Sequence, residues 1–391
     1  MVRYHGTIAT AIGILLLSAL GPAAAQAPQA PAIERLPPPA PTAPVAPEPP
    51  PLPDTVEAYG VVFDAWVAKY KPKTAILVVR RGGKTVFIKG HGTDPEKPSL
   101  LASLSKMITG VCLATLVRDG KVKFTTPMRE ALPKFFKRHG RPADPRFEDA
   151  TVEQLLVHRS GIAGNPDGDP LSKIWRARAE RGQSHLAPPQ PLLAEHLKNP
   201  LKREPGGQFA YSNTGYLVLT AIIEEKSSKP YETYCREAVF DKLGITSARL
   251  DPNFRHYSGA GGWTIAGADY LALLEVFNPA NDFLGDEVKS WIDRMQNAWN
   301  EVNWGNWYSL GVFTSAGAGR WSVSHNGLLN SRGKNPAGKP ITAIVTSFAY
   351  RRADGTSVFV AVTPAQPRDS PAMSALRHDL DRANRAVTKL P

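Results

Sequence analysis

Residues 103–117 read SLSKMITGVCLATLV and begin with the tetrapeptide S-x-x-K. The residues after Lys106 are almost all apolar or small, which predicts a buried helix. If Ser103 opens that helix, residues three apart share a face, so Lys106 points back at Ser103. A first helical turn also leaves backbone N–H groups unpaired beside the serine. The stretch therefore predicts a hydroxyl that an amine can activate and that backbone amides can assist.

The tetrapeptide alone is a weak signal. With 22 serines and 21 lysines in 391 residues, about one S-x-x-K match is expected by chance. A second match does occur, from Ser331 to Lys334. It lies among Gly and Pro with no apolar helix after it, so only the match at Ser103 has the right context.

Three further segments follow in order along the chain. Residues 155–162 read LLVHRSGI, residues 205–216 read PGGQFAYSNTGY, and residues 324–327 read SHNG. With S-x-x-K, this ordered set resembles the serine β-lactamase and penicillin-binding-protein superfamily. The nearest branch looks like the class C group, with its D-alanyl-D-alanine carboxypeptidases, D-aminopeptidases and β-lactamase-like esterases. The resemblance extends over roughly residues 55–385 and, unlike any one motif, is specific.

The resemblance implies a serine hydrolase that works through an acyl-enzyme intermediate. It implies that Ser103 is the nucleophile and that Lys106 and Tyr211 share the general-base and general-acid work. Asn213 would hydrogen-bond the lysine or the substrate amide. A crowded Lys/Tyr pair fits this chemistry, because neighbouring positive charge favours phenolate and disfavours a second ammonium.

The H-x-G segment is expected on a strand that lines the cleft. There the resemblance places His325 where relatives have Lys or His; an ordinary loop histidine is the alternative. Gly327 would lie beside the oxyanion site, whose donors would be the backbone N–H groups of Ser103 and Leu328. Many relatives continue with another Gly, whereas this chain continues with two leucines. We expect these bulky side chains to narrow or reshape the site, which puts efficient β-lactam turnover in doubt.

Some aromatic and imidazole side chains have a simpler interpretation. We expect His158 to be a buried, hydrogen-bonded structural histidine, away from the catalytic motifs. Five of the eight tryptophans fall between residues 291 and 321. They could stack on a sugar or peptide near a cleft, but helix and sheet packing is the preferred interpretation.

The hydrophobic patterns predict an α+β fold. Residues 55–70 have helical spacing, and the tail has a helical face that starts after Pro371. Expected strands are 74–80, 84–90, 308–314, 320–324, 341–351 and 356–363. Strands from both ends of the chain would form one antiparallel sheet flanked by the terminal helices. A helical lobe, roughly residues 103–300, would be inserted between them, with the active site in the cleft.

The beginning of the chain predicts export. Residues 1–25 have a positive residue, a short apolar stretch over 8–20 and an A-x-A cleavage pattern, as in a signal peptide. The apolar stretch is too short to span a bilayer. Residues 26–53 form a Pro/Ala-rich linker, and residues 54–391 the hydrolase domain. We therefore expect a periplasmic or secreted protein with no transmembrane anchor after cleavage.

Composition excludes several other classes of protein. The net charge is +12, but the basic residues are scattered, so no nucleic-acid partner is expected. The histidines form no metal-binding pattern, and neither a metal nor another cofactor is expected. Cys112 and Cys235 could pair after export or remain buried free thiols.

The leading hypothesis is an exported serine hydrolase acting on an amide or ester. Its substrate would be a small molecule or a peptidoglycan-derived compound: a cell-wall D-amino-acid peptide, a β-lactam or a small ester. The alternative is a catalytically weak penicillin-binding-like protein that binds cell-wall fragments. The intact set of Ser103, Lys106 and Tyr211 disfavours that alternative.

Overall fold

A computed structural model of the chain describes residues 50–164, 169, 171, 189–303, 305–317, 320–330, 333–334, 340–341, 344–364, 366 and 370–391. The expected signal peptide (1–25), the linker up to residue 49 and Ser331 of the second S-x-x-K match lie outside the described residues. Among the described helices, none combines the length and the apolar character needed to cross a bilayer.

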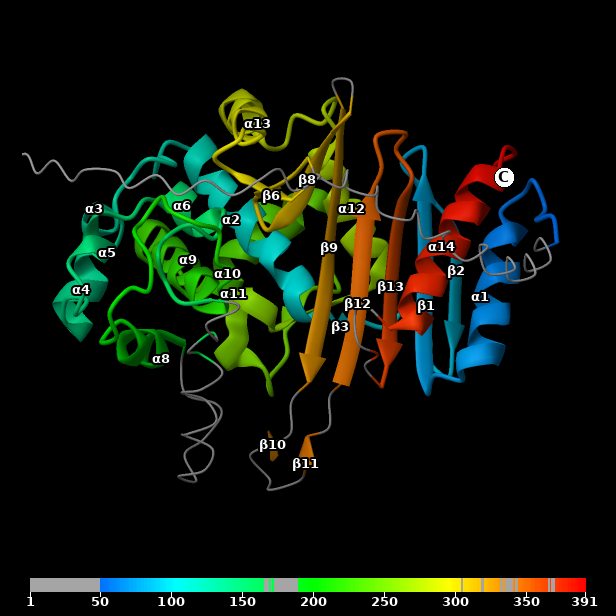
Figure 1. Cartoon of the computed structure of the whole chain (residues 1–391), viewed down its shortest axis with the longest axis horizontal. Helices are drawn as coiled ribbons and strands as arrows, with labels where there is room; N and C mark the ends of the chain where they lie inside the picture. The colour runs from blue at the N-terminus through cyan, green and yellow to red at the C-terminus, as the bar shows by residue number, and fades with distance from the viewer. Residues whose placement is uncertain are drawn as a thin grey trace, which may run out of the picture. The chain divides into compact units, whose positions relative to one another are not determined.

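The largest sheet takes its strands from both ends of the chain (Figure 1). Within the described residues it has eight strands in the order β2-β1-β13-β12-β9-β8-β7-β6, and every neighbouring pair is antiparallel. The bounds are β1 Thr74–Arg81, β2 Lys84–His91, β6 Glu301–Asn303, β7 Asn306–Ser309, β8 Val312–Gly317, β9 Arg320–Asn330, β12 Ile344–Arg351 and β13 Ser357–Thr363. The predicted antiparallel sheet is confirmed.

Two of the predicted strands differ from the structure in a way that matters for the site. The single strand expected over 308–314 is wrong, because Leu310 (φ 36°) and Gly311 (φ 79°) form a turn between β7 and β8. At Gly311 a Cβ atom would lie 2.2 Å from the carbonyl carbon of Lys106, so only glycine allows this close approach. Strand β9 runs on to Asn330 instead of ending at residue 324, which carries the H-x-G segment within the strand.

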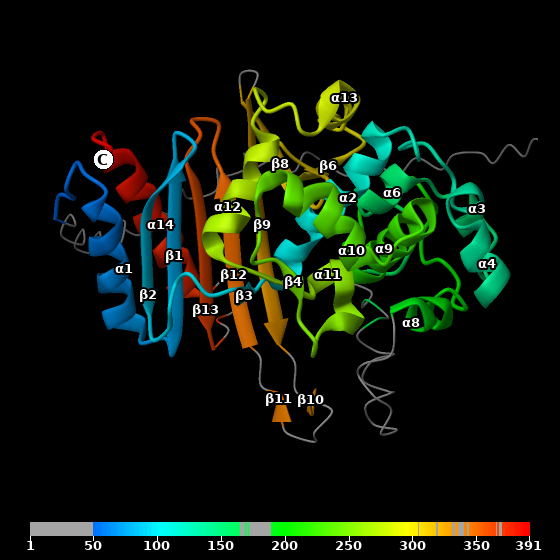
Figure 2. The same ribbon diagram turned by 180° about the vertical axis from the view of Figure 1, so that it is seen from behind.

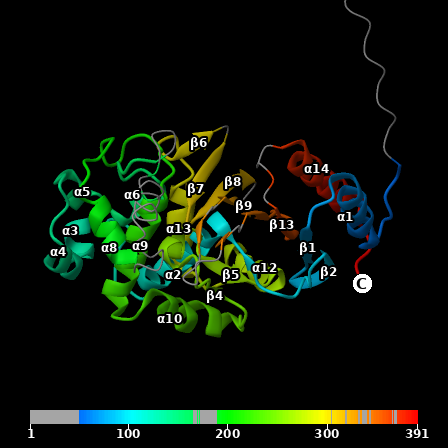
Figure 3. The same ribbon diagram turned by 90° about the horizontal axis from the view of Figure 1, so that it is seen from below.

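The first and last helices pack together on one face of the sheet (Figure 3). They are α1 Glu57–Tyr70 and α14 Pro371–Ala386, as the apolar spacing predicts. Tyr59 and Trp66 of α1 are buried there, and the Trp66 indole N–H donates to the carbonyl of Ala372 at 2.7 Å. The buried side chains of α1, α14 and the sheet form a hydrophobic core on the face of the sheet opposite the helical region.

The other face is covered by a helical region that the chain forms between β2 and β6 (Figure 2). Its helices are α2 Ser105–Arg118, α3 Met128–Ala131, α4 Pro133–His139, α5 Arg146–Asp149, α6 Val152–Leu156, α8 Pro189–His196, α9 Asn213–Ser227, α10 Tyr231–Cys235, α11 Ser258–Gly261, α12 Gly267–Leu274 and α13 Gly285–Arg294. Short turns of 3-10 or π type lie at Ala102–Leu104, Arg236–Phe240, Asp241–Leu243, Arg255–Tyr257 and Glu275–Phe277. A small sheet joins β3 Ser99–Leu100, β5 Trp263–Ile265 and β4 Arg249–Leu250, and a separate pair joins β10 Gly333–Lys334 to β11 Pro340–Ile341. The α+β architecture is as predicted.

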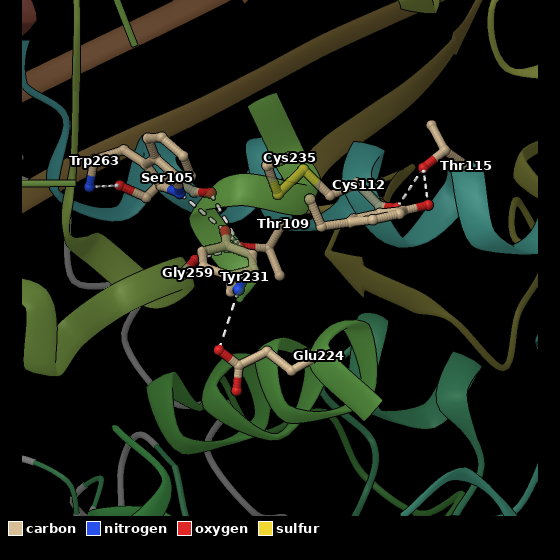
Figure 4. Close-up of a disulfide and its surroundings, with 10 residues drawn as sticks. Ser105, Thr109, Cys112, Thr115, Glu224, Tyr231, Cys235, Gly259 and Trp263 are labelled. Carbon is tan, nitrogen blue, oxygen red and sulfur yellow. Dashed lines mark hydrogen bonds between the residues drawn. A yellow bond between two sulfur atoms is a disulfide. The ribbon is translucent and has the colours of Figure 1, made fainter. Parts of the chain in front are cut away.

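Helix α2 is fixed in this region by a disulfide and by hydrogen bonds (Figure 4). The structure pairs Cys112 of α2 with Cys235 of α10, with Cα atoms 5.4 Å apart, an ordinary separation for a disulfide. One turn before Cys112, the Thr109 hydroxyl lies 2.8 Å from the Tyr231 hydroxyl and donates to the Gly259 carbonyl at 2.8 Å. The helix that follows Ser103 is therefore held on two sides.

Candidate active site

Ser103 lies where the chain passes from β3 into α2. It is the middle residue of the 3-10 turn Ala102–Leu104, so α2 itself starts two residues later than the sequence pattern suggests. Ala102 adopts a left-handed conformation (φ 49°), which turns the backbone sharply before the serine. Ser103 is half-buried, whereas its neighbours in the turn are buried. The serine is thus the member of this turn that solvent or a ligand can reach.

Lys106 is completely buried and lies directly behind the serine. Its Nζ is 3.4 Å from Ser103 Oγ, which confirms that the i, i+3 spacing brings the two side chains together. The same amine donates to Asn213 Oδ1 at 2.7 Å and to the Ala260 carbonyl at 2.7 Å. None of these three hydrogen-bond partners carries a charge.

This environment favours a neutral lysine. Burial lowers the pKa of Lys106 from 10.5 to about 7, and the more distant charge of Asp169 opposes part of that change. A neutral amine has two N–H donors and one lone pair. The donors match Asn213 and Ala260, which leaves the lone pair for the hydroxyl proton of Ser103. The geometry therefore supports a lysine that accepts a proton from Ser103 near neutral pH.

Tyr211 and Asn213 reach Lys106 from the start of α9. Lys106 Nζ lies 4.8 Å from the centroid of the Tyr211 ring, and Tyr211 is half-buried. Asn213 is the first residue of α9, and its side-chain oxygen accepts from Lys106. The structure thus gathers Ser103, Tyr211 and Asn213 around one amine, as the family resemblance implies.

His325 stands on β9 and faces the tyrosine. Its ring centroid is 6.1 Å from that of Tyr211. Nδ1 lies 2.7 Å from the Asn326 carbonyl, which can only accept, so Nδ1 carries a proton. Nε2 lies 2.9 Å from the hydroxyl of Tyr308, and burial raises the pKa of Tyr308 well above its ordinary value. Both ring nitrogens of His325 therefore have hydrogen-bond partners, which fix the orientation of the ring beside Tyr211. The alternative of a plain loop histidine is wrong, because His325 is a buried strand residue.

Gly327 lets β9 lie directly against the turn that carries Ser103. A Cβ atom at this position would be 2.5 Å from the Leu101 carbonyl oxygen and 2.3 Å from Ser347 Oγ. Ser347, paired with Gly327 across the sheet, also donates its hydroxyl proton to that carbonyl at 2.7 Å. The glycine of H-x-G is therefore a packing requirement that sets the distance between strand and nucleophile.

Leu328 does not narrow the site through its side chain, so that expectation is wrong for this residue. Side chains alternate along a strand, and Leu328 shares its face with Asn326. Asn326 accepts a hydrogen bond at 2.6 Å from Arg377 of α14, on the far side of the sheet. Leu328 is 47% exposed there, whereas Leu329 is buried on the same face as Gly327. Of the two leucines, only Leu329 points toward the helical region.

The backbone of β9 is open on one edge beside the site. Strand β12 pairs with it from Val323 to Asn330, but β8 pairs with it only from Arg320 to Ser324. Among the described strands, none covers that second edge from His325 onward. The N–H and C=O groups that point away from β12 in this segment are thus not paired with a described strand, and the N–H expected of Leu328 lies in this segment.

The structure also brings to the site one residue that the sequence patterns did not single out, Asp169, and one that they placed away from it, His158. The buried Asp169 accepts hydrogen bonds from Ser212, Asn213 and Thr214 at the start of α9. His158 is buried and hydrogen-bonded, as predicted, but it is not remote, because its ring centroid is 4.5 Å from that of Tyr211. Only tertiary contacts reveal Asp169, since it lies in a Gly/Pro-rich loop with no motif around it.

Most of the tryptophans described between 291 and 321 serve packing. Trp291 stacks on Phe124 with centroids 4.1 Å apart, and Trp321 is buried and donates to Asp293. Trp299 is half-exposed under the guanidinium of Arg159. The described residues also hold no group of three His, Cys, Asp or Glu side chains that could bind a metal ion.

The arrangement can be set beside known proteins. The family model for beta-lactamase matches residues 62–365. The chain belongs to the beta-lactamase family. This match takes in the sheet, the helical region and every predicted site residue.

Individual relatives of this beta-lactamase-family chain are distant. It is 28% identical over 184 residues to a putative penicillin-binding protein, PbpX, of Bacillus subtilis, covering 45% of this chain and 40% of that protein. It is 27% identical over 188 residues to the D-alanyl-D-alanine-carboxypeptidase/endopeptidase AmpH of Escherichia coli, covering 45% of each. Thus the chain matches less than half the length of these two curated relatives.

Solved structures share the fold at low identity. The octameric penicillin-binding protein homologue from Pyrococcus abyssi has a TM-score of 0.63 and 20% identity, over 83% of this chain and 77% of that one. A D-amino acid amidase from Ochrobactrum anthropi has a TM-score of 0.62 and 18% identity, over 84% and 97%. These likenesses support the fold and leave the substrate to be argued from the site.

Proposed function

We propose that the chain is an exported serine hydrolase that cleaves an amide bond in a D-amino-acid-containing peptide through an acyl-enzyme at Ser103. The observation that carries this proposal is the fully buried Lys106 amine, 3.4 Å from Ser103 Oγ and hydrogen-bonded only to neutral groups. An ordinary structural lysine would be exposed or paired with a carboxylate. The choice of substrate follows the similarity to a D-alanyl-D-alanine carboxypeptidase.

The first chemical step is acylation. Ser103 Oγ attacks the substrate carbonyl while its proton passes to the Lys106 amine, either directly or through the Tyr211 phenol. The tetrahedral intermediate then collapses, the C–N bond breaks, and the departing amine takes the same proton. In the second step a water molecule adds to the ester carbonyl while its proton passes to the Lys106 amine. The bond between the carbonyl carbon and Ser103 Oγ then breaks, Ser103 takes that proton, and the acid leaves.

The open edge of β9 supplies the binding surface in this proposal. An extended peptide can pair with the backbone from His325 onward, as an added strand. Backbone N–H groups of Ser103 and Leu328 would donate hydrogen bonds to the oxyanion. Each such donor typically raises the rate about 10²- to 10³-fold. The Leu328 side chain lies on the other face, so it does not obstruct such a peptide.

Mass spectrometry of the intact protein tests the acyl-enzyme. A fluorophosphonate probe should add one adduct to the wild-type protein and none to Ser103→Ala. Ser331→Ala, which alters the second S-x-x-K match, is the matched control and should label like wild type. Labelling of Ser103→Ala would overturn the assignment of the nucleophile.

Substrate class is resolved by comparing turnover of a D-alanyl-D-alanine peptide, its L-alanyl-L-alanine isomer, a penicillin and a p-nitrophenyl ester. We expect the D,D-peptide to be cleaved and the L,L-peptide not. A penicillin adduct that persists for hours, with no peptide cleavage, would instead support the weakly catalytic binding protein.

Export is part of the same proposal. The signal-like residues 1–25 support it, and so does the Cys112–Cys235 disulfide, because disulfides persist mainly in oxidising compartments. Cell fractionation with sequencing of the mature N-terminus tests it. A protein recovered from the cytoplasm with its first residues intact would contradict export.

A further inference from the structure

Tyr211 is bracketed on both sides by a single residue, His158. The His158 carbonyl accepts from the Ala210 N–H at 2.8 Å, and His158 Nδ1 accepts from the Ser212 N–H at 3.1 Å. The imidazole also lies against the Tyr211 ring, with centroids 4.5 Å apart. Backbone bonds before and after Tyr211, plus ring contact, leave the phenol little freedom to move.

The state of His158 suits this role and no proton-transfer role. Because Nδ1 accepts a hydrogen bond, the proton is on Nε2, which is buried and has no hydrogen-bond partner. Burial, with Lys106 and His325 nearby, holds the pKa of His158 well below its ordinary value. Its backbone is left-handed (φ 58°), a conformation that costs a non-glycine residue of order 1–3 kcal/mol. Such strain persists only where surrounding structure requires it.

Asp169 holds the next residues from another side. Its carboxylate accepts from Ser212 Oγ at 3.1 Å, from the Asn213 N–H and from the Thr214 N–H at 3.2 Å. These groups belong to the first turn of α9, where a negative charge is favourable. Asp169 is only 8% exposed, so few water molecules compete for its oxygens.

The two contacts meet at Ser212, whose N–H goes to His158 and whose hydroxyl goes to Asp169. We infer that His158 and Asp169 are positioning residues that together hold Tyr211 and Asn213 against Lys106. The inference rests on the proposed function of Tyr211 and Lys106, and it adds two residues outside the reacting set. A displacement of about 1 Å at such a site can cost 10²-fold in rate.

Asp169 is charged and His158 is neutral, so replacing each residue should affect the pH dependence of the reaction differently. Around Lys106 the titratable groups are Tyr211 and Tyr216 from the α9 side, His158 after α6, His325 on β9, and Asp169. Among the described residues that act on Lys106, Asp169 is the negatively charged one, and it raises the pKa of Lys106. Removing this charge should lower the pKa of Lys106. The acid limb of the pH–rate profile, where the rate rises as Lys106 loses its proton, should then move to lower pH. Replacing the neutral His158 should leave that limb in place.

The experiment measures the rate of Ser103 modification by a fluorophosphonate probe from pH 5 to 9, using the full chain. We expect His158→Phe, which keeps a ring but loses Nδ1, to slow modification about 10- to 100-fold with an unchanged acid limb. His158→Asn, which tolerates the left-handed backbone and retains an acceptor, should recover part of the loss. Asp169→Asn should slow modification and shift the limb to lower pH.

Two controls match the variants in burial. His256→Phe alters another buried histidine, whose ring contacts Phe254 and Tyr257. Asp144→Asn alters another carboxylate that is 8% exposed and binds backbone N–H groups, those of Arg146 and Leu201. Both controls should lose stability in a thermal melt while the modification rate of the folded protein stays within threefold of wild type.

A folded His158→Phe with a wild-type rate, or an Asp169→Asn limb that does not move, would overturn the inference for that residue. If His158→Phe does not fold, His158→Ala replaces it. A wild-type modification rate in His158→Ala, or a His158→Asn rate no higher than that of His158→Ala, would also overturn the inference for His158. Failure of the proposed function is seen separately, as a wild-type protein that is not labelled at Ser103.

Discussion

Replacing Lys106 by methionine should abolish acylation and yet stabilise the protein near neutral pH. Methionine fills a similar volume without an amine, so the variant avoids burying a group that is charged in the unfolded chain. Because the variant loses the general base, the rate of Ser103 acylation should fall about 10²- to 10⁴-fold. The stability gain is offset in part by the unpaired carbonyl of Ala260, which costs about 1–3 kcal/mol.

The magnitude follows from proton linkage. Between pH 7 and 10.5 the unfolded chain, with Lys106 at its ordinary pKa, binds more protons than the folded chain, with its pKa of about 7. Wild-type stability therefore rises with pH across this window, and the methionine variant lacks that contribution. Its advantage over wild type should shrink by about 2–3 kcal/mol between pH 7.5 and 9.5, whatever constant offset the lost hydrogen bonds add.

Urea unfolding of both proteins at pH 7.5, 8.5 and 9.5 measures this difference, since all other titrating groups cancel. Lys121→Met, which alters an exposed lysine three residues after the end of α2, is the control and should show no such pH dependence. A difference between Lys106→Met and wild type that is constant over this range would refute a lowered lysine pKa. The proton-accepting role of Lys106 would then lose its physical basis.

Three other outcomes follow from the geometry of the site. Gly327→Ala should fold but acylate about 10²-fold more slowly, because its methyl group would press on the Leu101 carbonyl and displace the serine turn; a wild-type rate by intact mass spectrometry would contradict this. Leu328→Ala should stay within a few-fold of wild type on a p-nitrophenyl ester, since its side chain is on the far face, and a hundredfold loss would show that the side chain reaches the substrate. Removing the disulfide with Cys112→Ala and Cys235→Ala should cost about 2–5 kcal/mol in urea unfolding while Ser103 still labels; an unlabelled but folded double variant would argue that the bridge shapes the site.

The sequence predicted the site where chemistry depends on close spacing or on ordered motifs. S-x-x-K placed Lys106 behind Ser103 through helical periodicity, and Y-x-N placed Asn213 on the same amine through the resemblance. The terminal helices and most strands also followed from apolar spacing. Helical periodicity and apolar spacing depend on residues near one another in the chain, where local geometry decides the outcome. The contact of Asn213 with Lys106 spans 107 positions and followed from the resemblance alone.

Other features depended on contacts between distant segments, which no local pattern records. The turn at Leu310–Gly311 interrupts a run of strand-forming residues because the backbone of Lys106 approaches it. The face on which Leu328 lies depends on the register of β9 against β12. Asp169 acquires its partners only when it meets the start of α9, more than forty positions along the chain.

The disulfide changes the covalent topology of the site. Ser103 and Lys106 precede Cys112, whereas Tyr211 and Asn213 lie inside the closed ring that runs from Cys112 to Cys235, 123 positions apart. A protease that cut this ring once would leave a single covalent molecule, with the nucleophile still tethered to its proton-transfer partners. Such a nicked chain would migrate as one band until a reductant was added and as two bands afterwards. A single cut in the helical region between the two cysteines would therefore leave Ser103 and Tyr211 in one covalent molecule.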